Sequence, residues 1–318
     1  MSRFVHSRNV STATDHIPTC RVVTAKKISE RLFAELQEDI KDLSRKPLLV
    51  GFLASEDDGA KVYAEWTGKT ARQNGFEFEL RTVDREELEE RIINANQDPK
   101  VDGIIVYYPI FGNRQDQYLQ QIVDIEKDVE GLSHRYLFNM YQNIRYMDPA
   151  RTKKSIIPCT PLAVVKILEY LQIYNTFLPY GNRLYGRTIT VINRSEVVGR
   201  PLAALLANDG ASVYSVDIEN VQQFSRGEGL RKRRHSVSEK TGWSLEQCLP
   251  LSDVVISGVP GDRFKVPTHL LRDGVCCINF SSQKNFDPDV KEVASLYVPA
   301  IGSVTITVLL RNLLVCSH

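Results

Sequence analysis

The residues with the clearest chemical signal lie at a turn in the second half of the chain. The turn reads Asn193-Arg-Ser-Glu-Val-Val-Gly199 and joins an expected strand, 188–192, to an expected helix, 198–208. Asn tolerates a left-handed backbone at such a turn, and Gly199 allows close packing near the helix start, where free N–H groups bind phosphate. This order predicts a dinucleotide site, although the full Gly-x-Gly-x-x-Gly pattern is absent.

Asp217 strengthens this prediction. It closes the next expected strand, 211–217, and lies 22 residues after Ser195. A carboxylate there accepts hydrogen bonds from ribose hydroxyls and repels a 2′-phosphate, so the sequence favours NAD over NADP. Arg194 is a competing signal, because a guanidinium binds a 2′-phosphate well. The plainer alternative is that Asp217 is an ordinary acid at the end of a strand.

A second set of candidate residues lies in the first half of the chain. Tyr63 and Thr67 stand four positions apart on an expected helix, 60–74, and therefore share one face. Pro109 follows an expected buried strand, 103–108, at the end where ligands of open α/β sheets bind. Taken singly, each of these signals is weak.

Cys159 is the one candidate nucleophile. It lies in Pro158-Cys-Thr-Pro161, where Thr160 is expected to cap a helix that runs to about residue 171. The partial positive charge of a helix start lowers a thiol pKa, which would suit catalysis, but a structural cysteine fits this turn equally well. The six cysteines show no metal-ligand spacing, so no metal site and no disulfide framework is expected.

Two successive α/β patterns must position these residues. The expected strands are 48–53, 78–82, 103–108, 188–192, 211–217, 254–257, 275–279 and 296–298, and the expected helices include 60–74, 86–95, 198–208 and 304–315. Alternation of this kind predicts parallel sheets in two α/β domains, the second a Rossmann-type dinucleotide-binding fold. The segment 131–155 reads as irregular.

Composition restricts the class of protein. The 318 residues are 42% hydrophobic and 25% charged, which is typical of a folded chain, and none of their apolar runs is long enough to span a membrane. Forty basic and thirty-nine acidic residues give a net charge of +1, which disfavours nucleic acid as a partner. Residues 1–20 read as a flexible terminus of a cytoplasmic protein, with a mitochondrial targeting signal as the alternative.

A basic segment, 226–247, interrupts the second pattern. It contains Arg231-Lys-Arg-Arg-His-Ser236 and reads as a solvated insertion. The alternatives are a localisation tag or a phosphorylation site at Ser236.

These motifs, in this order, resemble the methylenetetrahydrofolate dehydrogenase/cyclohydrolase family over nearly the whole chain. The runs 112–121 and 200–210 add to the resemblance. It implies two domains that face each other across a cleft and a homodimer. Residues 21–157 would form the folate-binding catalytic domain, with a C-terminal helix, 304–318, packing back on it. Residues 158–303 would form the NAD-binding domain.

The family motifs carry over with substitutions. A Tyr-x-x-x-Lys motif lines the folate pocket in the family, and this chain has Tyr63 but Thr67 in place of the lysine. Tyr107 stands where the family has a glutamine, and Glu130 replaces the aspartate that binds the pterin ring. The Gly-rich segment near the C-terminus is shortened to Val298-Pro-Ala-Ile-Gly-Ser-Val-Thr305.

The missing lysine indicates which reaction is lost. When 5,10-methylenetetrahydrofolate gives a hydride to NAD, nitrogen lone pairs of the folate stabilise the product cation, so no side chain must move a proton. Hydrolysis of the methenyl product needs an acid or base of tuned pKa, which Thr67 cannot supply. Lys69 lies about 200° further round the helix. We therefore expect the dehydrogenase without the cyclohydrolase; a bifunctional enzyme and a non-catalytic NAD-binding scaffold are the alternatives.

The resemblance assigns a role to each candidate residue. Expected catalytic positions are Cys159, Tyr63 and Thr67. Expected substrate-binding residues are Tyr63, Thr67, Tyr107, Pro109 and Glu130. Expected cofactor-binding residues are Arg194, Ser195, Val198, Gly199, Asp217, Ile218, Gly258, Val259, Asn279 and Thr305.

Overall fold

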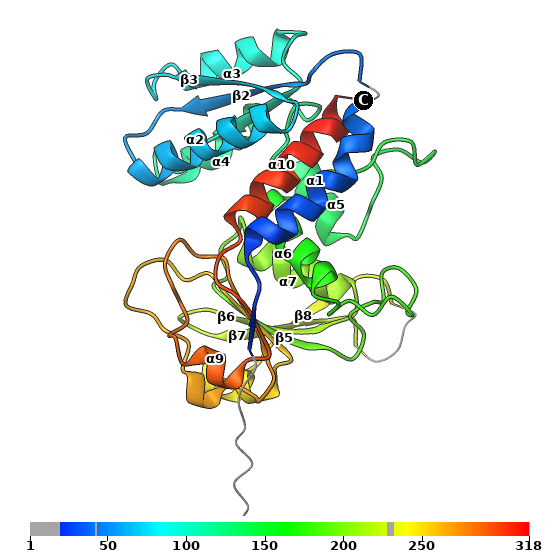
Figure 1. Ribbon diagram of the computed structural model, residues 1–318, viewed down its shortest axis with the longest axis vertical. Coiled ribbons are helices and arrows are strands. Elements are labelled where there is room, and N and C mark those ends of the chain that lie inside the picture. Colours follow the sequence, from blue (N-terminus) through cyan, green and yellow to red (C-terminus); the bar gives the residue numbers. More distant parts are fainter. Residues whose placement is uncertain (1–19, 42, 228–231, 318) are drawn as a thin grey trace, which may run out of the picture.

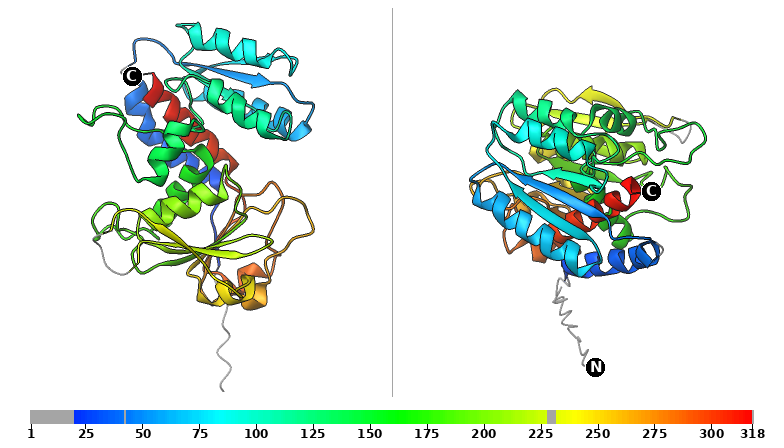
Figure 2. Two further views of the ribbon diagram at one scale, coloured as in Figure 1. Left: turned by 180° about the vertical axis from the view of Figure 1, so that it is seen from behind. Right: turned by 90° about the horizontal axis from the view of Figure 1, so that it is seen from above.

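The computed structural model describes residues 20–41, 43–227 and 232–317, so most of the expected flexible terminus lies outside the described residues. A parallel sheet and a larger sheet, parallel except for two antiparallel strands at one edge, lie at opposite ends of the molecule, and a layer of helices joins them (Figure 1). The two views of Figure 2 show the same arrangement from behind and from above. The structure therefore has the two α/β domains that the sequence predicts.

The smaller sheet has the order β3-β2-β4, and its strands are parallel. Its strands are β2 (Leu48–Leu53), β3 (Glu77–Thr82) and β4 (Gly103–Val106), and its helices are α2 (Asp58–Gln73), α3 (Leu88–Gln97) and α4 (Arg114–Ile122). Asp57 caps α2 by accepting a hydrogen bond from the Ala60 N–H at 2.7 Å. Gly75, with φ of 90°, takes the left-handed conformation just after the helix ends.

The larger sheet has the order β1-β11-β10-β9-β5-β6-β7-β8. Its strands are β1 (Arg21–Val22), β5 (Thr188–Ile192), β6 (Ser212–Val216), β7 (Val221–Ser225), β8 (Ser236–Glu239), β9 (Val254–Ser257), β10 (Cys276–Asn279) and β11 (Leu296–Val298). The chain leaves β5 toward β6 on one side and later returns to β9 on the other side. The gap between the ends of β5 and β9 is therefore the switch point at which open α/β sheets bind ligands.

The layer between the sheets includes α1 (Ala25–Lys41), α5 (His134–Tyr141), α6 (Cys159–Tyr170) and α10 (Gly302–Cys316). Helix α10 packs between α1 and α6 (Figure 1). The Asn312 side chain of α10 donates hydrogen bonds to the Val129 carbonyl at 2.9 Å and the Ile157 carbonyl at 3.2 Å. The C-terminal helix thus packs back on the first domain, as the resemblance implies.

Several elements differ from the sequence-based expectations. Helix α1 has no counterpart among the expected elements, and α5 lies inside the segment expected to be irregular. Residues 21 and 22, placed in the first domain by the expected boundary, instead pair with β11 in the larger sheet. Helix α6 begins at Cys159 with Pro158 at the capping position, so Thr160 is not the cap.

The described part of the basic segment, 226–227 and 232–247, contains a strand and a short helix that the sequence did not predict, while residues 228–231 lie outside the described residues. Strand β8 pairs antiparallel with β7, and the short helix α8 (Leu245–Cys248) follows. His235 stacks on Phe224 with ring centroids 5.5 Å apart, and its backbone N–H donates to the Asn208 side chain at 2.9 Å. Strand β8 lacks the usual alternation because its residues are all exposed, which explains why the sequence reads as a loop.

The described residues contain neither a membrane-spanning helix nor a cluster of metal ligands. None of their helices is long and apolar enough to cross a membrane. Within the same ranges, no group of three or more His, Cys, Asp or Glu residues could hold a metal ion.

Candidate active site

The turn after β5 has the left-handed residue that the sequence predicts. Asn193 has φ of 97°, and its side chain bonds in two directions. Its amide nitrogen donates to the Gly258 carbonyl at 2.6 Å, and its amide oxygen accepts from the Ser195 N–H at 2.8 Å. Since Gly258 follows β9, these bonds tie the two sides of the switch point together.

Helix α7 (Gly199–Asn208) begins where the backbone comes very close to this turn. A Cβ placed on Gly199 would lie 1.7 Å from the Asn193 carbonyl oxygen, so only glycine fits. The Ser195 hydroxyl accepts hydrogen bonds from the Val198 and Gly199 N–H groups, each at 3.3 Å. The sequence predicted close packing at Gly199. In the structure, the backbone of Gly199 packs against the backbone of Asn193.

Asp217 lies directly after β6, at the position predicted for a ribose ligand. Its side chain is exposed, as is the fully exposed side chain of Ile218 beside it. One carboxylate oxygen accepts from the Ile218 N–H at 2.9 Å. The site thus presents a carboxylate and an apolar surface to solvent at the end of the second strand.

Arg194, predicted to bind the cofactor, makes several hydrogen bonds to protein. Its guanidinium donates to the Ser215 hydroxyl at 3.1 Å and carbonyl at 2.6 Å, and to the Asn220 side chain at 2.6 Å and carbonyl at 2.9 Å. These bonds brace the turn that holds Asp217. Four of the five guanidinium N–H groups therefore have protein acceptors, which leaves one N–H group for a 2′-phosphate.

The later cofactor-binding candidates also have internal partners. A Cβ on Gly258 would lie 1.8 Å from the Phe280 ring, so a side chain has no room there. The Val259 N–H donates to Asn285 at 2.9 Å, and the Asn279 amide donates to three carbonyls, including Pro299 at 3.1 Å. Thr305 is buried on α10. These residues shape the loops that border the switch point.

The first-domain candidates form one cluster. The Tyr63 ring meets the Tyr107 ring edge to face, with centroids 5.9 Å apart. Thr67 is fully buried beneath them, and its hydroxyl donates to the Tyr63 carbonyl at 2.8 Å. Burial raises the pKa of Tyr63, and nearby Cys159 and Glu130 raise it further. Helix α2, the end of β4 and the start of α6 thus bring the predicted residues together.

Glu130 is the titratable group of this cluster with a pKa nearest neutrality. Burial raises the pKa of its carboxyl to about 8; a backbone hydrogen bond opposes the rise, and the charge of Asp128 adds to it. That hydrogen bond comes from the Val106 N–H at 3.2 Å, which fixes the carboxyl beside the end of β4.

Cys159 does not have the lowered pKa that the helix start suggested. Burial, with a contribution from the charge of Glu130, raises the pKa of its thiol well above the ordinary value. The thiol donates to the Val129 carbonyl at 3.2 Å, and the Asn312 amide lies 3.5 Å from the sulfur. Desolvation outweighs the helix start, so this geometry favours the structural alternative.

Two buried hydroxyls at the end of β4 have no hydrogen-bond partner in the described chain. They belong to Tyr107 and Tyr108. Burial raises the pKa of both. The Thr67 side chain is close enough to Tyr107 to oppose part of the rise, but its hydroxyl donates to the Tyr63 carbonyl and forms no hydrogen bond of regular geometry with the Tyr107 hydroxyl. Since a buried unpaired hydroxyl costs free energy, its presence beside Glu130 marks a place where a polar ligand would supply the partner. Sequence reasoning missed Tyr108, whose only signal was its place beside Tyr107.

A cavity of about 1110 Å³ opens beside this cluster, between α1, α2 and the start of α10. Tyr63 lines it, as do Phe33, Trp66 and Gly302. Thr67, Tyr107 and Glu130 do not line it and lie behind Tyr63. Pro109 follows Tyr108 through a cis peptide bond at the end of β4. Of the predicted substrate-binding residues, Tyr63 alone is on the cavity wall.

Comparison with known proteins agrees with this geometry. Residues 23–130 match the family model for the tetrahydrofolate dehydrogenase/cyclohydrolase catalytic domain, and residues 158–227 match the model for its NAD(P)-binding domain. A Schizosaccharomyces pombe protein named methylenetetrahydrofolate dehydrogenase (NAD+) is 57% identical over 93% of this chain and 92% of its own length.

Another relative and a solved structure extend the comparison. The Dictyostelium discoideum protein of the same name is 48% identical over 88% of each chain. The structure of the NAD-dependent 5,10-methylenetetrahydrofolate dehydrogenase from Saccharomyces cerevisiae matches with a TM-score of 0.89 and 54% identity, covering 94% of this chain and 97% of that one. The chain therefore belongs to the tetrahydrofolate dehydrogenase/cyclohydrolase family.

Proposed function

We propose that this protein oxidises 5,10-methylenetetrahydrofolate to 5,10-methenyltetrahydrofolate, with NAD as the hydride acceptor, and that it lacks cyclohydrolase activity. The proposal rests first on the names of the relatives that are 48% to 57% identical to it. The observation in this chain that carries it is the exposed Asp217 carboxylate together with an Arg194 guanidinium that uses four of its five N–H groups on protein acceptors.

The residues around the switch point fit NAD. Asp217 offers a free carboxylate oxygen to ribose hydroxyls and would repel a 2′-phosphate. Ile218 offers an apolar surface for the adenine ring beside it. Bound NAD supplies the hydride acceptor. The protein contributes the rigid turn from Asn193 to Gly199, which fixes where the dinucleotide lies relative to the first domain.

The first-domain cluster fits a pterin. The Glu130 carboxylate would accept hydrogen bonds from the amino and ring N–H groups of the pterin. The Tyr107 hydroxyl would gain the partner that it lacks. Tyr63, at the wall of the adjoining cavity, would lie against the ring system. These contacts position the methylene carbon and exclude water, and hydride transfer asks nothing more of the side chains.

Thr67 supports the loss of the second activity. The family lysine would supply a proton-transferring group at this position. The Thr67 hydroxyl is instead buried and donates a hydrogen bond to the Tyr63 carbonyl. Lys69 is exposed, and its ammonium lies 5.1 Å from the centroid of the Trp66 ring, away from the cluster. Neither side chain is placed to activate water.

One observation favours the bifunctional alternative. Glu130, with its pKa of about 8, is a group whose pKa suits acid–base catalysis near neutral pH. If Glu130 transferred protons during hydrolysis of the methenyl product, it would replace the missing lysine as the acid–base group. We assign it to pterin binding because the Val106 N–H holds the carboxyl beside the Tyr107 and Tyr108 hydroxyls, which have no partner among the residues that the structure describes.

The assembly and the location extend this proposal. The resemblance favours a homodimer, and the composition of the N-terminus favours the cytoplasm. The net charge of +1 and the lack of a long apolar run disfavour nucleic acid and membrane as partners. Light scattering on the purified chain would report twice the monomer mass. A fluorescent fusion at the C-terminus would report the location, and mitochondrial signal would favour the targeting alternative instead.

The direct test of the dehydrogenase uses both dinucleotides in parallel. The purified protein should reduce NAD when 5,10-methylenetetrahydrofolate is added. In the Asp217→Ser variant, the ratio of the rate with NAD to the rate with NADP should be smaller than in the wild type. Failure with both dinucleotides would leave the scaffold alternative or a different substrate. Equal rates with NAD and NADP would contradict the role given to Asp217.

A further inference from the structure

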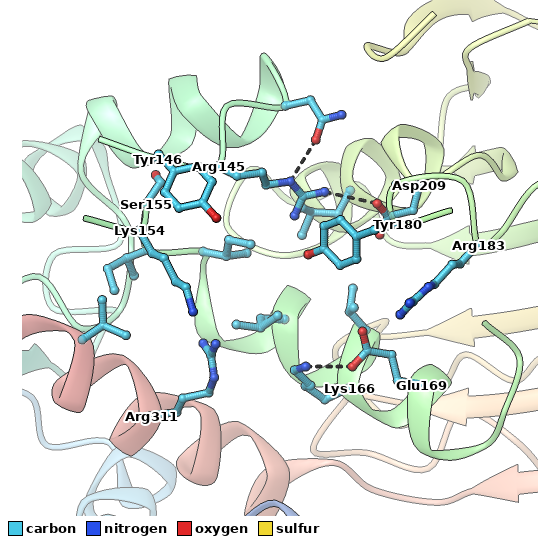
Figure 3. A pocket seen from close by; sticks show the side chains of 18 of the residues that line it. Arg145, Tyr146, Lys154, Ser155, Lys166, Glu169, Tyr180, Arg183, Asp209 and Arg311 are labelled. Carbon is cyan, nitrogen blue, oxygen red and sulfur yellow. Dashed lines mark hydrogen bonds and ion pairs between the residues drawn. The ribbon is translucent and has the colours of Figure 1, made fainter. Parts of the chain in front are cut away.

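A second cavity, of about 650 Å³, is lined by none of the residues predicted to bind folate or NAD. It lies between the segment 143–157, helix α6, the loop 174–183 and the second half of α10 (Figure 3). We call it the basic pocket. Its size falls in the range of small-molecule sites in proteins.

The lining of the basic pocket is strongly cationic, although the whole chain has a net charge of only +1. Seven lining side chains are Lys or Arg, and two are acids. Both acids are already paired: Asp209 with Arg145 at 3.1 Å, and Glu169 with Lys166 at 2.7 Å. The remaining cations make no ion pair within the described ranges; they are Arg151, Lys154, Arg183, Arg233 and Arg311.

Two features of these cations indicate a missing anion. Figure 3 shows the side chains of Lys154 and Arg311 pointing toward each other across the pocket. Like charges that face each other without a counter-ion destabilise the fold. Independently, the Nε of Arg183 is buried and has no hydrogen-bond partner among the described residues. A buried unpaired donor carries a free-energy cost that a bound acceptor would relieve.

Aromatic rings hold two of the guanidinium groups in place. Arg183 lies over the Tyr180 ring, 5.6 Å from its centroid, and Arg151 lies over the Tyr146 ring at 5.9 Å. Stacking of this kind reduces the freedom of the side chains and leaves their N–H groups available at the edge. Arginine groups arranged in this way suit bidentate binding of phosphate oxygens.

We propose that the basic pocket binds a small molecule that carries two or more phosphate groups. A single orthophosphate would occupy only a small part of 650 Å³ and would meet only some of the five cations that lack an ion pair in the described part of the chain. The site is separate from the one proposed for NAD, and the proposal does not depend on the dehydrogenase activity.

The test is calorimetric titration of the full chain with inorganic pyrophosphate, tripolyphosphate and ATP. Each titration is made with saturating NAD present, so that the dinucleotide site is already occupied. We expect binding by all three probes, and binding of orthophosphate about tenfold weaker or worse. If ATP binds no more tightly than tripolyphosphate, the phosphates alone are recognised; if ATP binds more tightly, the tyrosines contribute to a base. Either result supports the proposal.

Variants make the test specific to this pocket. The pair Lys154→Gln and Arg311→Gln should weaken tripolyphosphate binding about tenfold or more. The matched control, Lys46→Gln with Lys100→Gln, removes the same net charge from exposed positions of the first domain and should leave binding unchanged. Without any anion, the first pair should also raise the melting temperature, because the facing charges are gone. That result shows that the variant folds.

Two outcomes would overturn the proposal. One is the absence of binding by all three probes, or binding that the pocket variant and the control weaken equally. The other is that the pocket variant changes the oligomeric mass at a fixed concentration while anion binding persists. That result would show that a second copy of the chain, and not a phosphorylated molecule, covers the pocket.

Discussion

The two halves of the candidate active site differ in how their polar groups are satisfied. At the turn after β5, the side chains of Asn193, Arg194 and Ser195 are all hydrogen-bonded to protein. At the end of β4, the Tyr107 and Tyr108 hydroxyls are buried without partners in the described chain, beside a carboxyl whose pKa is raised.

The difference indicates how each half would bind its ligand. The second-domain turn is shaped by close backbone contacts, so its form is fixed before a dinucleotide arrives. The first-domain cluster carries unmet hydrogen bonds, and a polar ligand would relieve their cost. A change in the turn should therefore damage the fold and the cofactor site together. A change in the cluster should weaken substrate binding and leave the fold intact or even more stable.

The largest effect is expected for Gly199→Ala. The new Cβ would meet the Asn193 carbonyl oxygen at 1.7 Å, so the turn must move. We expect a loss of about 3 kcal/mol or more in the free energy of unfolding, and NAD affinity reduced about 100-fold. Denaturant titration and NAD titration measure these. Gly302→Ala, whose Cβ would meet nothing within 4 Å, is the matched control for stability. NAD affinity within twofold of the wild type would contradict the account.

The next effect is expected for Glu130→Gln. The amide keeps the size of the side chain but can no longer accept from two N–H groups as a carboxylate does. The KM for methylenetetrahydrofolate should rise about 10- to 100-fold, which corresponds to a lost charged hydrogen bond of roughly 1.5 to 3 kcal/mol. Steady-state kinetics should show an unchanged KM for NAD. A rise in both KM values would mean that the two halves are not separate.

The pH dependence of the same step sharpens the comparison. Because the pKa of Glu130 is about 8 before substrate binds, its carboxyl is largely protonated at pH 7 and ionised at pH 9. The KM for the folate should therefore fall as pH rises toward 8, by up to about tenfold per unit, and level off above it. The Gln variant should give a flat profile. A wild-type profile that is flat between pH 6 and 9 would exclude Glu130 as the ionising group.

The smallest effect is expected for Tyr107→Phe. Removal of an unpaired buried hydroxyl should raise the free energy of unfolding of the ligand-free protein by up to about 1 kcal/mol, while the KM for the folate rises several-fold. Tyr136→Phe is the control, because the Tyr136 hydroxyl donates to the Ile125 carbonyl at 2.8 Å. That variant should be destabilised by about 1 kcal/mol. Equal destabilisation of both variants would show that Tyr107 already has a partner.

The sequence predicted most of the framework and the left-handed Asn193. Buried apolar runs between turn residues gave the strands at 188–192, 254–257 and 296–298 with the observed bounds. Strand β8 is wholly exposed, so it carries no alternation to detect. The resemblance to the family drew attention to Thr67. Only the structure shows that its hydroxyl donates a hydrogen bond to the Tyr63 carbonyl.

The chemistry of two site residues depended on distant neighbours. Sequence places Arg194 beside the dinucleotide turn, but its partners Ser215 and Asn220 lie more than twenty residues away and become neighbours only through the pairing of β5 with β6. Cys159 stands at a helix start, and burial against Val129 and Asn312 reverses the expected direction of its pKa shift. Local spacing cannot report effects of this kind.

The most direct measurement is the rate at which methenyltetrahydrofolate is hydrolysed in the presence of a concentrated, active preparation of the wild-type protein. We expect the spontaneous rate, since Thr67 cannot ionise and the carboxyl of Glu130 is held for the pterin. Hydrolysis that is faster than the spontaneous rate, and that is lost in Glu130→Gln, would contradict this expectation. It would show that Glu130 transfers the protons that the family lysine transfers in the cyclohydrolase reaction.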